Sequence, residues 1–180
     1  PVVIRVHEGL GQYHRRLFQV ITQAGGQLFA GLHLADTPGK TAVGNLQHHG
    51  QFQFLDQPID LLVVFDKSGS MSGSKIELVK HTLKFVVSQL KPSDRICLVE
   101  FQSTASVIAP FTRCSDDKKT RLNQTISKVS AGGGTNISLG VAVGLEMFRR
   151  REKRNALSSM LVLTDGQDGS MRTIDGVFEQ

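Results

Sequence analysis

Three short polar stretches lie far apart in the sequence, and together they hold small oxygen-bearing side chains that could bind a metal ion. These side chains are Asp66, Ser68, Ser70, Thr135 and Asp165. The first and third stretches directly follow apolar runs at residues 61–65 and 160–163, which are typical of buried strands. Loops that leave the carboxyl ends of neighbouring strands in an open α/β sheet converge on one crevice. Two carboxylates and three hydroxyls gathered there would suit Mg²⁺, or the similar cations Mn²⁺ and Ca²⁺.

The local spacing in these stretches favours a shared site. Ser68 and Ser70 are two residues apart, so in an extended turn both hydroxyls can face the same side as Asp66. Gly69 lets the backbone between them curve tightly. Three glycines at residues 132–134 would similarly allow the loop that carries Thr135 to approach. Mg²⁺ prefers octahedral coordination and usually keeps some water ligands, so one position could accept a carboxylate from another protein. The pattern predicts metal-assisted binding of a protein partner rather than catalysis.

From residue 59 onward the sequence alternates between strand and helix patterns. Strands are expected at residues 59–65, 95–101, 104–108 and 159–164, and helices at 76–90, 115–129 and 138–149. Ser115 and Ser138 are the expected caps of the last two helices. The second and third strands are joined by a short polar turn, which predicts an antiparallel pair at one edge. The alternation as a whole predicts a doubly wound, mostly parallel α/β sheet.

Residues 1–57 show strand patterns without intervening helix patterns. They are expected to form a β-rich segment ahead of an α/β domain at residues 58–180. Two strand patterns flank Gly25 and Gly26, which is a hairpin signal. No residue of this segment suggests a chemical role, and the histidines at 48 and 49 are expected in a surface loop.

The motif residues resemble those of the von Willebrand factor type A domain family. Its metal-ion-dependent adhesion site has the pattern Asp-x-Ser-x-Ser, then a Thr, then an Asp, which Asp66, Ser68, Ser70, Thr135 and Asp165 match in order. The resemblance covers roughly residues 59–170 and is nearest to intracellular members with RING domains and to inter-alpha-trypsin inhibitor heavy chains. It implies a Rossmann-like fold and a cation-dependent, non-enzymatic interaction module.

Two departures from the family pattern affect these expectations. The chain ends soon after Asp165, so the domain is expected to be incomplete at its C-terminus and to leave an exposed sheet edge. Lys67 places a cation beside the first motif. If its side chain points inward it would weaken metal binding, and if it points outward it would favour acidic partners.

Alternative functions remain open at this point. A Mg²⁺-dependent hydrolase or phosphotransferase would use Asp66 as nucleophile, although such enzymes usually have a second carboxylate where this chain has Ser68. A phosphate-binding loop at residues 69–75 lacks the required Gly-Lys-Ser/Thr ending. A third alternative is a metal-free scaffold within a protein of the ubiquitin-ligase type.

Composition narrows the range of partners. The 180 residues carry a formal charge of +5, but the dense basic run at 149–154 follows a helix pattern and precedes a strand, so it is interpreted as a solvated helix end rather than a nucleic-acid site. No apolar run approaches the roughly 20 residues that span a bilayer, so membrane insertion is not expected. Cys97 is expected in the core and Cys114 in a polar turn. Two cysteines are too few for a disulfide framework. This low number favours a cytoplasmic protein, because disulfides form mainly outside the cytoplasm.

Two further polar residues near the motifs have predicted roles. Asn136 could brace the loop of Thr135 through a side-chain hydrogen bond, and Asp168 is expected in a solvated loop.

Overall fold

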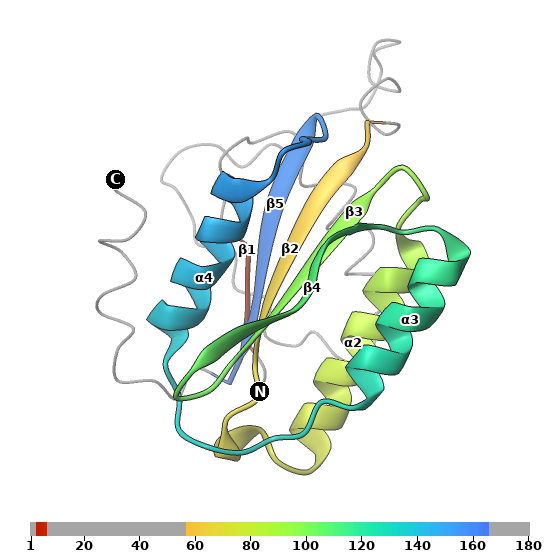
Figure 1. The fold of residues 1–180 in the computed structure, drawn as a ribbon. Coiled ribbons are helices and arrows are strands. Elements are labelled where there is room, and N and C mark those ends of the chain that lie inside the picture. The colour runs from red at the N-terminus through yellow and green to blue at the C-terminus, as the bar shows by residue number, and fades with distance from the viewer. Residues whose placement is uncertain (1–2, 7–56, 166–180) are drawn as a thin grey trace, which may run out of the picture.

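The fold is built around a five-stranded sheet, seen in a computed structural model that describes residues 3–6 and 57–165 (Figure 1). In chain order the strands are β1 (Val3–Val6), β2 (Ile59–Asp66), β3 (Arg95–Phe101), β4 (Ala105–Arg113) and β5 (Leu157–Thr164). Their spatial order is β1-β5-β2-β3-β4, with β2 parallel to both neighbours and with β1 and β4 antiparallel at the edges. The hairpin predicted around residues 25 and 26, the histidines at 48 and 49, and Asp168 lie outside the described residues.

Helices cover both faces of the sheet, which confirms the predicted doubly wound α/β fold. The helical elements are the short 3₁₀ helix η2 (Gly69–Met71), α2 (Ser74–Gln89), α3 (Asp116–Ser127) and α4 (Ile137–Arg150). The helices α2 and α3 pack together on one face, and α4 lies on the other (Figure 1). In the part of the chain that the structure describes, no helix is long and apolar enough to cross a membrane.

The central strand β2 contributes side chains to two separate hydrophobic cores. Leu61, Val63 and Phe65 pack in the core with α2 and α3. Leu62 and Val64 pack in the core with α4. Successive side chains of a strand point to opposite faces, so a strand covered on both faces buries apolar side chains on both. This explains the continuous apolar run at residues 61–65 of β2, which Asp60 and Asp66 flank.

The start of α4 differs from the sequence prediction. The N-cap residue is Asn136, whose side-chain oxygen accepts a hydrogen bond from the Leu139 amide at 3.0 Å. The predicted cap, Ser138, lies within the first turn instead. Asparagine and serine are both good caps, and Asn136 has the position whose side chain reaches the free amides of the first turn. The side chain of Asn136 therefore stabilises the helix that follows Thr135.

The edge strand β4 is longer than predicted and continues through Pro110 to Arg113. Its pairing with β3 shifts register on both sides of Leu98, which marks an irregularity in the ladder. A proline lacks an amide hydrogen and is tolerated in a strand only at an edge or bulge. The predicted strand ended at Ile108, whereas the predicted edge position of this strand allows it to continue through Pro110.

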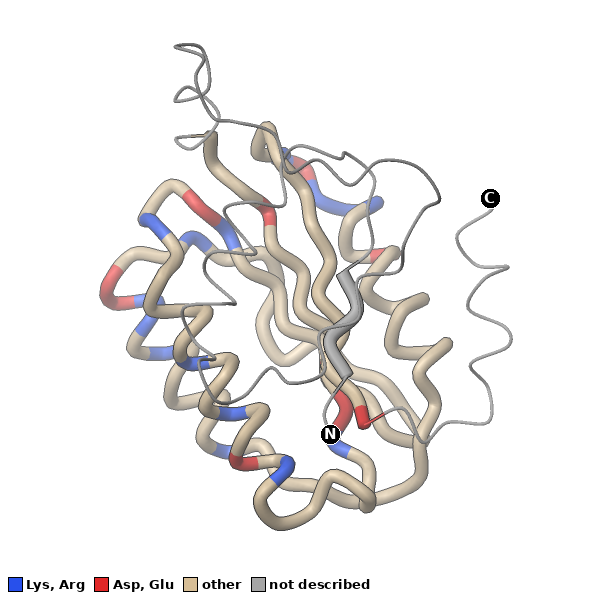
Figure 2. The backbone as a smooth tube through the Cα atoms, turned by 180° about the vertical axis from the view of Figure 1, so that it is seen from behind, with Lys and Arg blue, Asp and Glu red and all other residues tan. Residues whose placement is uncertain are grey.

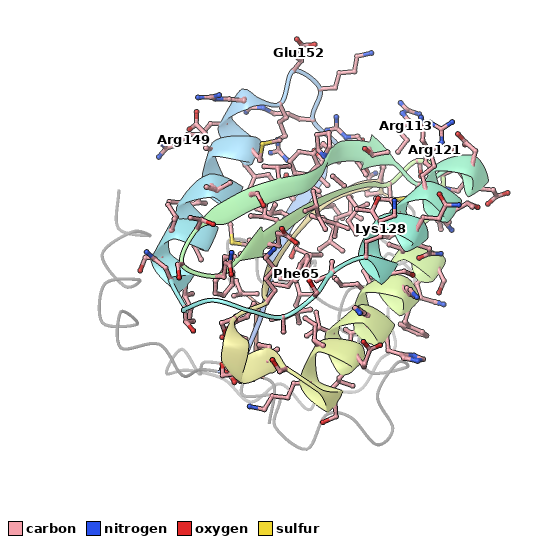
Figure 3. The ribbon with its side chains drawn as sticks, turned by 60° about the horizontal axis from the view of Figure 1, so that its bottom comes forward. Phe65, Arg113, Arg121, Lys128, Arg149 and Glu152 are labelled. Atoms are coloured by element: carbon pink, nitrogen blue, oxygen red, sulfur yellow. The ribbon has the colours of Figure 1, made fainter. Side chains whose placement is uncertain are left out.

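The side chains of the basic run at the end of α4 are only partly exposed to solvent. Arg149 and Glu152 project away from the fold (Figure 3) and are exposed, as expected. Arg151, however, has a side chain that is mostly buried and donates to Asp60 at 2.8 Å. Its guanidinium also lies over the ring of Phe148. The interpretation of the whole run as solvent-facing was therefore wrong at Arg151, because a charged residue can be buried when a buried carboxylate pairs with it.

Both cysteines are free and fully buried. Cys97 lies in the core as predicted, and Cys114 lies in the predicted connection between two elements, but its side chain is buried in the core with α2 and α3 rather than among polar groups. Burial raises the pKa of each thiol from an ordinary value of 9.0 to about 12. Burial favours the neutral form because the thiolate would lose its hydration.

We expect both thiols of the folded protein to be unreactive towards a disulfide reagent at about pH 8, because the thiolate is the reactive form and burial keeps each thiol neutral. Both should react when the chain is unfolded in urea, and the measurement is the number of thiols modified before and after urea is added. The raised pKa also predicts that the thiol contribution to stability is complete below pH 9.0 and is lost as the pH rises towards about 12. Rapid modification of either cysteine without urea would contradict the buried positions.

Candidate metal centre

The carboxyl ends of β2 and β5 lie side by side at one end of the sheet (Figures 1 and 2). The two strands are parallel and paired up to Phe65 and Leu163, so Asp66 and Asp165 follow at the same edge. A direct contact supports this placement, because the Thr164 hydroxyl donates to Asp66 Oδ2 at 2.9 Å. The register of the sheet thus brings together the ends of segments that are separated by about a hundred residues in sequence.

The first motif forms a tight turn that is ordered by Asp66. Its carboxylate is fully buried, and Oδ1 accepts the Ser68 amide at 2.7 Å. The Ser68 hydroxyl, also buried, lies 3.1 Å from the hydroxyl of the exposed Ser70. Met71, which ends η2, is fully buried in the core and anchors the far side of the turn. The two hydroxyls are therefore neighbours, as the spacing of two residues predicted.

The loop that leads to Thr135 is tied to this turn by two backbone hydrogen bonds. The Gly69 amide donates to the Gly133 carbonyl at 2.9 Å, and the Gly132 amide donates to the Lys67 carbonyl at 2.7 Å. Gly133 has a φ of 80°, a left-handed conformation that other residues adopt only with strain. The glycines at residues 132–134 thus permit a close backbone approach, and Thr135 follows at a half-buried position.

The turn between β3 and β4 also supports these two loops. The sequence analysis predicted this turn but did not assign it to the site. The Ser103 hydroxyl accepts the Gly134 amide at 2.9 Å, and the Phe101 carbonyl accepts the Lys67 amide at 2.9 Å. Serine in a short polar turn is too common to stand out in a sequence. Only the adjacency of β3 to β2 makes this turn part of the centre.

Two lysines lie close to the motif, and each forms an ion pair. Lys67 donates to Glu100 at 2.8 Å, so its charge is directed to the neighbouring strand and compensated there. Lys75, at the start of α2, donates to Asp165 Oδ2 at 2.9 Å. The sequence analysis considered Lys67 but not Lys75. A lysine five residues after Ser70 has no local signal, because its partner lies 90 residues away.

The donor set suits a hard divalent cation. Among residues 57–165, no three His, Cys, Asp or Glu side chains are grouped so that they could hold a metal ion, so the candidate ligands here combine carboxylates with hydroxyls. The structure brings Asp66, Ser68, Ser70 and Asp165 to the same end of the sheet and ties the Thr135 loop to the first motif by backbone contacts. Carboxylate and hydroxyl oxygens with few protein ligands are typical of Mg²⁺ sites. The residues present therefore fit such a cation.

A sequence model of the von Willebrand factor type A domain matches residues 60–179. The chain belongs to this family. Domains of this class generally act as protein-interaction or adhesion modules, and membership supports that general role here.

Curated relatives share only part of their length with this chain. It is 32% identical over 111 residues to the Arabidopsis thaliana E3 ubiquitin-protein ligase WAV3, a match that covers 61% of this chain and 15% of that protein. It is 31% identical over 113 residues to mouse inter alpha-trypsin inhibitor, heavy chain 4, covering 59% of this chain and 12% of that protein. The chain thus spans less than a sixth of the length of these two relatives.

Solved structures show the same fold. The von Willebrand factor domain of the type V pili tip protein Mfa5 from Porphyromonas gingivalis superposes with a TM-score of 0.51 at 18% identity. The match covers 58% of this chain and 36% of that one.

Proposed function

We propose that this domain binds a partner protein through a divalent cation, with Mg²⁺ as the first candidate. The cation would be held by Asp66, Ser68, Ser70, Thr135 and Asp165. The observation that supports this proposal is the joining of three distant segments at one end of the sheet. The Asp66–Thr164 hydrogen bond joins β2 to β5, and the Gly69–Gly133 bond joins the first motif to the Thr135 loop.

The protein residues have distinct tasks in this proposal. Asp66 orders the first turn through the Ser68 amide and offers its charge at a rigid strand end. Ser68 and Ser70 supply adjacent neutral oxygens. Thr135 and Asp165 contribute either directly or through water. A bound cation would supply a positive charge with a vacant coordination position, which suits a carboxylate of the partner.

The proposed module consists of residues 58–180 together with the edge strand β1 from the preceding segment, and we propose that it is not an enzyme by itself. The segment at residues 1–57 precedes it, and β1 from that segment pairs with β5 at the edge of the sheet. None of the observations at the site favours phosphoryl transfer, because the position two residues after Asp66 is the hydroxyl of Ser68 rather than a carboxylate. We therefore propose protein interaction as the role of the centre.

Calorimetric titration with Mg²⁺ and with Mn²⁺ tests the metal site. Wild-type protein should bind one cation, and Ser70→Ala should weaken binding by about tenfold or more, as expected when a ligand or its support is lost. Ser72→Ala is the matched control, because Ser72 is also exposed and lies two residues further on outside the proposed set. Equal affinities of the Ser70 and Ser72 variants would remove Ser70 from the site, and absence of binding by wild-type protein would overturn the proposal.

A second measurement separates adhesion from catalysis. Acidic peptides should bind in Mg²⁺ and be released by EDTA, whereas the same peptides with amides in place of carboxylates should not bind. An aryl phosphate should not be hydrolysed in the presence of Mg²⁺. Mg²⁺-dependent hydrolysis that disappears in Asp66→Asn would instead identify a hydrolase.

A further inference from the structure

A positively charged group already contacts the proposed metal centre, namely the ammonium group of Lys75. Its Nζ lies 2.9 Å from Asp165 Oδ2, although the two residues are 90 positions apart in sequence. The Asp165 side chain is only 2% exposed, whereas that of Lys75 is 35% exposed. A carboxylate that is this buried requires compensation of its charge, and Lys75 supplies it from the first turn of α2.

The two carboxylates of the centre are compensated in different ways. Asp66 accepts hydrogen bonds from two neutral donors, the Ser68 amide and the Thr164 hydroxyl. These bonds can persist when a carboxylate also binds a cation, because an ionised carboxylate has about four acceptor sites. Asp165 is different because its contact with Lys75 is an ion pair. A divalent cation beside Asp165 would lie close to that ammonium group, and two like charges at such a distance repel each other.

The geometry points to Lys75 as an internal competitor of the divalent cation at Asp165. This inference rests on the proposed function and adds its regulation. In the metal-free state Lys75 neutralises Asp165, and metal binding displaces the ammonium group towards solvent. The lysine side chain is flexible and carries a compact charge on a four-carbon stem, and its partial exposure leaves a route outward without movement of α2.

Competition of this kind links metal affinity to the stability of the metal-free protein. The Lys75–Asp165 pair stabilises the metal-free state and must be broken before Asp165 can serve as a ligand. Removing the ammonium group should therefore strengthen metal binding and weaken the metal-free fold. Lys67 would not have the same effect, because its ammonium group is paired with Glu100 on β3.

The test compares two variants in which a lysine of α2 is replaced with uncharged glutamine. Lys75→Gln removes the ion pair with Asp165 at 2.9 Å, and Lys80→Gln removes an ion pair with Glu77 at 2.8 Å that lies within α2. Both variants lose one positive charge, so a general change in electrostatic attraction affects both. In Mg²⁺ titrations, Lys75→Gln should bind about two- to fivefold more tightly than Lys80→Gln, which corresponds to the loss of one partly exposed ion pair. Lys75→Arg keeps the charge and should bind like wild type.

The reactivity of the Lys75 amine can be measured in the wild-type protein. An amine-acetylating reagent should modify Lys75 slowly in EDTA and faster in saturating Mg²⁺, as measured by mass spectrometry of peptides. Lys80 should be modified at the same rate in both conditions. Equal rates at Lys75 in the two conditions would show that metal does not displace it.

The possible results separate this inference from the proposed function. Binding of Mg²⁺ by wild type and Lys75→Gln with equal affinity would overturn the competition and leave the metal centre intact. Binding by Lys75→Gln alone would support the competition in its strongest form, with the lysine excluding the metal. Binding by neither protein would overturn both.

Discussion

Replacing Asp60 with asparagine is expected to lower the free energy of unfolding by about 3–5 kcal/mol, the range measured when one partner of a buried ion pair is removed. Asp60 is fully buried at the start of β2. It accepts from Arg95 Nε at 2.7 Å and from Arg95 Nη2 at 2.5 Å. Arg151 Nη1 donates to the same carboxylate at 2.8 Å, and the Asn155 amide does so at 3.1 Å. The variant would leave two mostly buried guanidinium groups without their counter-charge.

The surroundings of Asp60 make relaxation difficult. Burial lowers the pKa of Arg151, and the charge of Asp60 opposes this effect. Both guanidinium groups lie against the ring of Phe111, so neither can reach water without disturbing this packing. Asp60 thereby joins β2 to β3 and to the end of α4, at the end of the sheet opposite the proposed metal centre.

Urea denaturation of Asp60→Asn beside Glu146→Gln measures this effect. Glu146 forms an ion pair with Arg150 at 2.5 Å on an exposed face of α4, so its loss should cost less than about 1 kcal/mol. Equal destabilisation by the two variants would show that burial of Asp60 does not determine its contribution.

Replacing Gly140 with valine should destabilise the protein by about 3 kcal/mol, the upper part of the range for overpacked cores. Gly140 lies where α4 touches the sheet. A Cβ atom there would lie 2.7 Å from Phe101 Cδ1 and 2.9 Å from Phe101 Cβ. Phe101 is fully buried at the end of β3, so its ring could move only by displacing neighbouring core side chains. The helix would have to move away from the strands.

The matched control for this prediction is Ala142→Val on the exposed side of the same helix. Valine is a weaker helix former than alanine, so this change should cost no more than about 0.7 kcal/mol. Thermal or urea unfolding of the two variants gives the comparison. If Gly140→Val were as stable as the control, α4 and β3 could not pack as closely as described at this position.

The Gly140 position also bears on the proposed function. Asn136 caps α4 directly after Thr135, so the position of the helix determines where the Thr135 loop begins. A shift of α4 away from the sheet is expected to weaken Mg²⁺ binding as well as stability.

Local sequence patterns predicted most of the architecture. The apolar runs of β2 and β5 and the periodic stripes of α2 and α3 depend on contacts within one segment, and their predicted positions were correct to within a few residues. The motif residues were also recognisable because each stretch follows a strand or a glycine-rich segment. The cap of α4 was misplaced by two residues, since Asn136 and Ser138 have similar propensities and only the backbone conformation selects between them.

Tertiary structure determined what the local patterns could not. The Lys75–Asp165 and Arg151–Asp60 pairs join residues about 90 positions apart. The charge of a residue is visible in the sequence, but its partner depends on the order of the strands and the placement of the helices. The sequence by itself identified the α/β class and a set of candidate oxygen ligands, because these follow from local periodicity and residue chemistry. Only the fold revealed that a lysine is paired with one of those candidates, Asp165, because burial and long-range proximity arise when the sheet assembles.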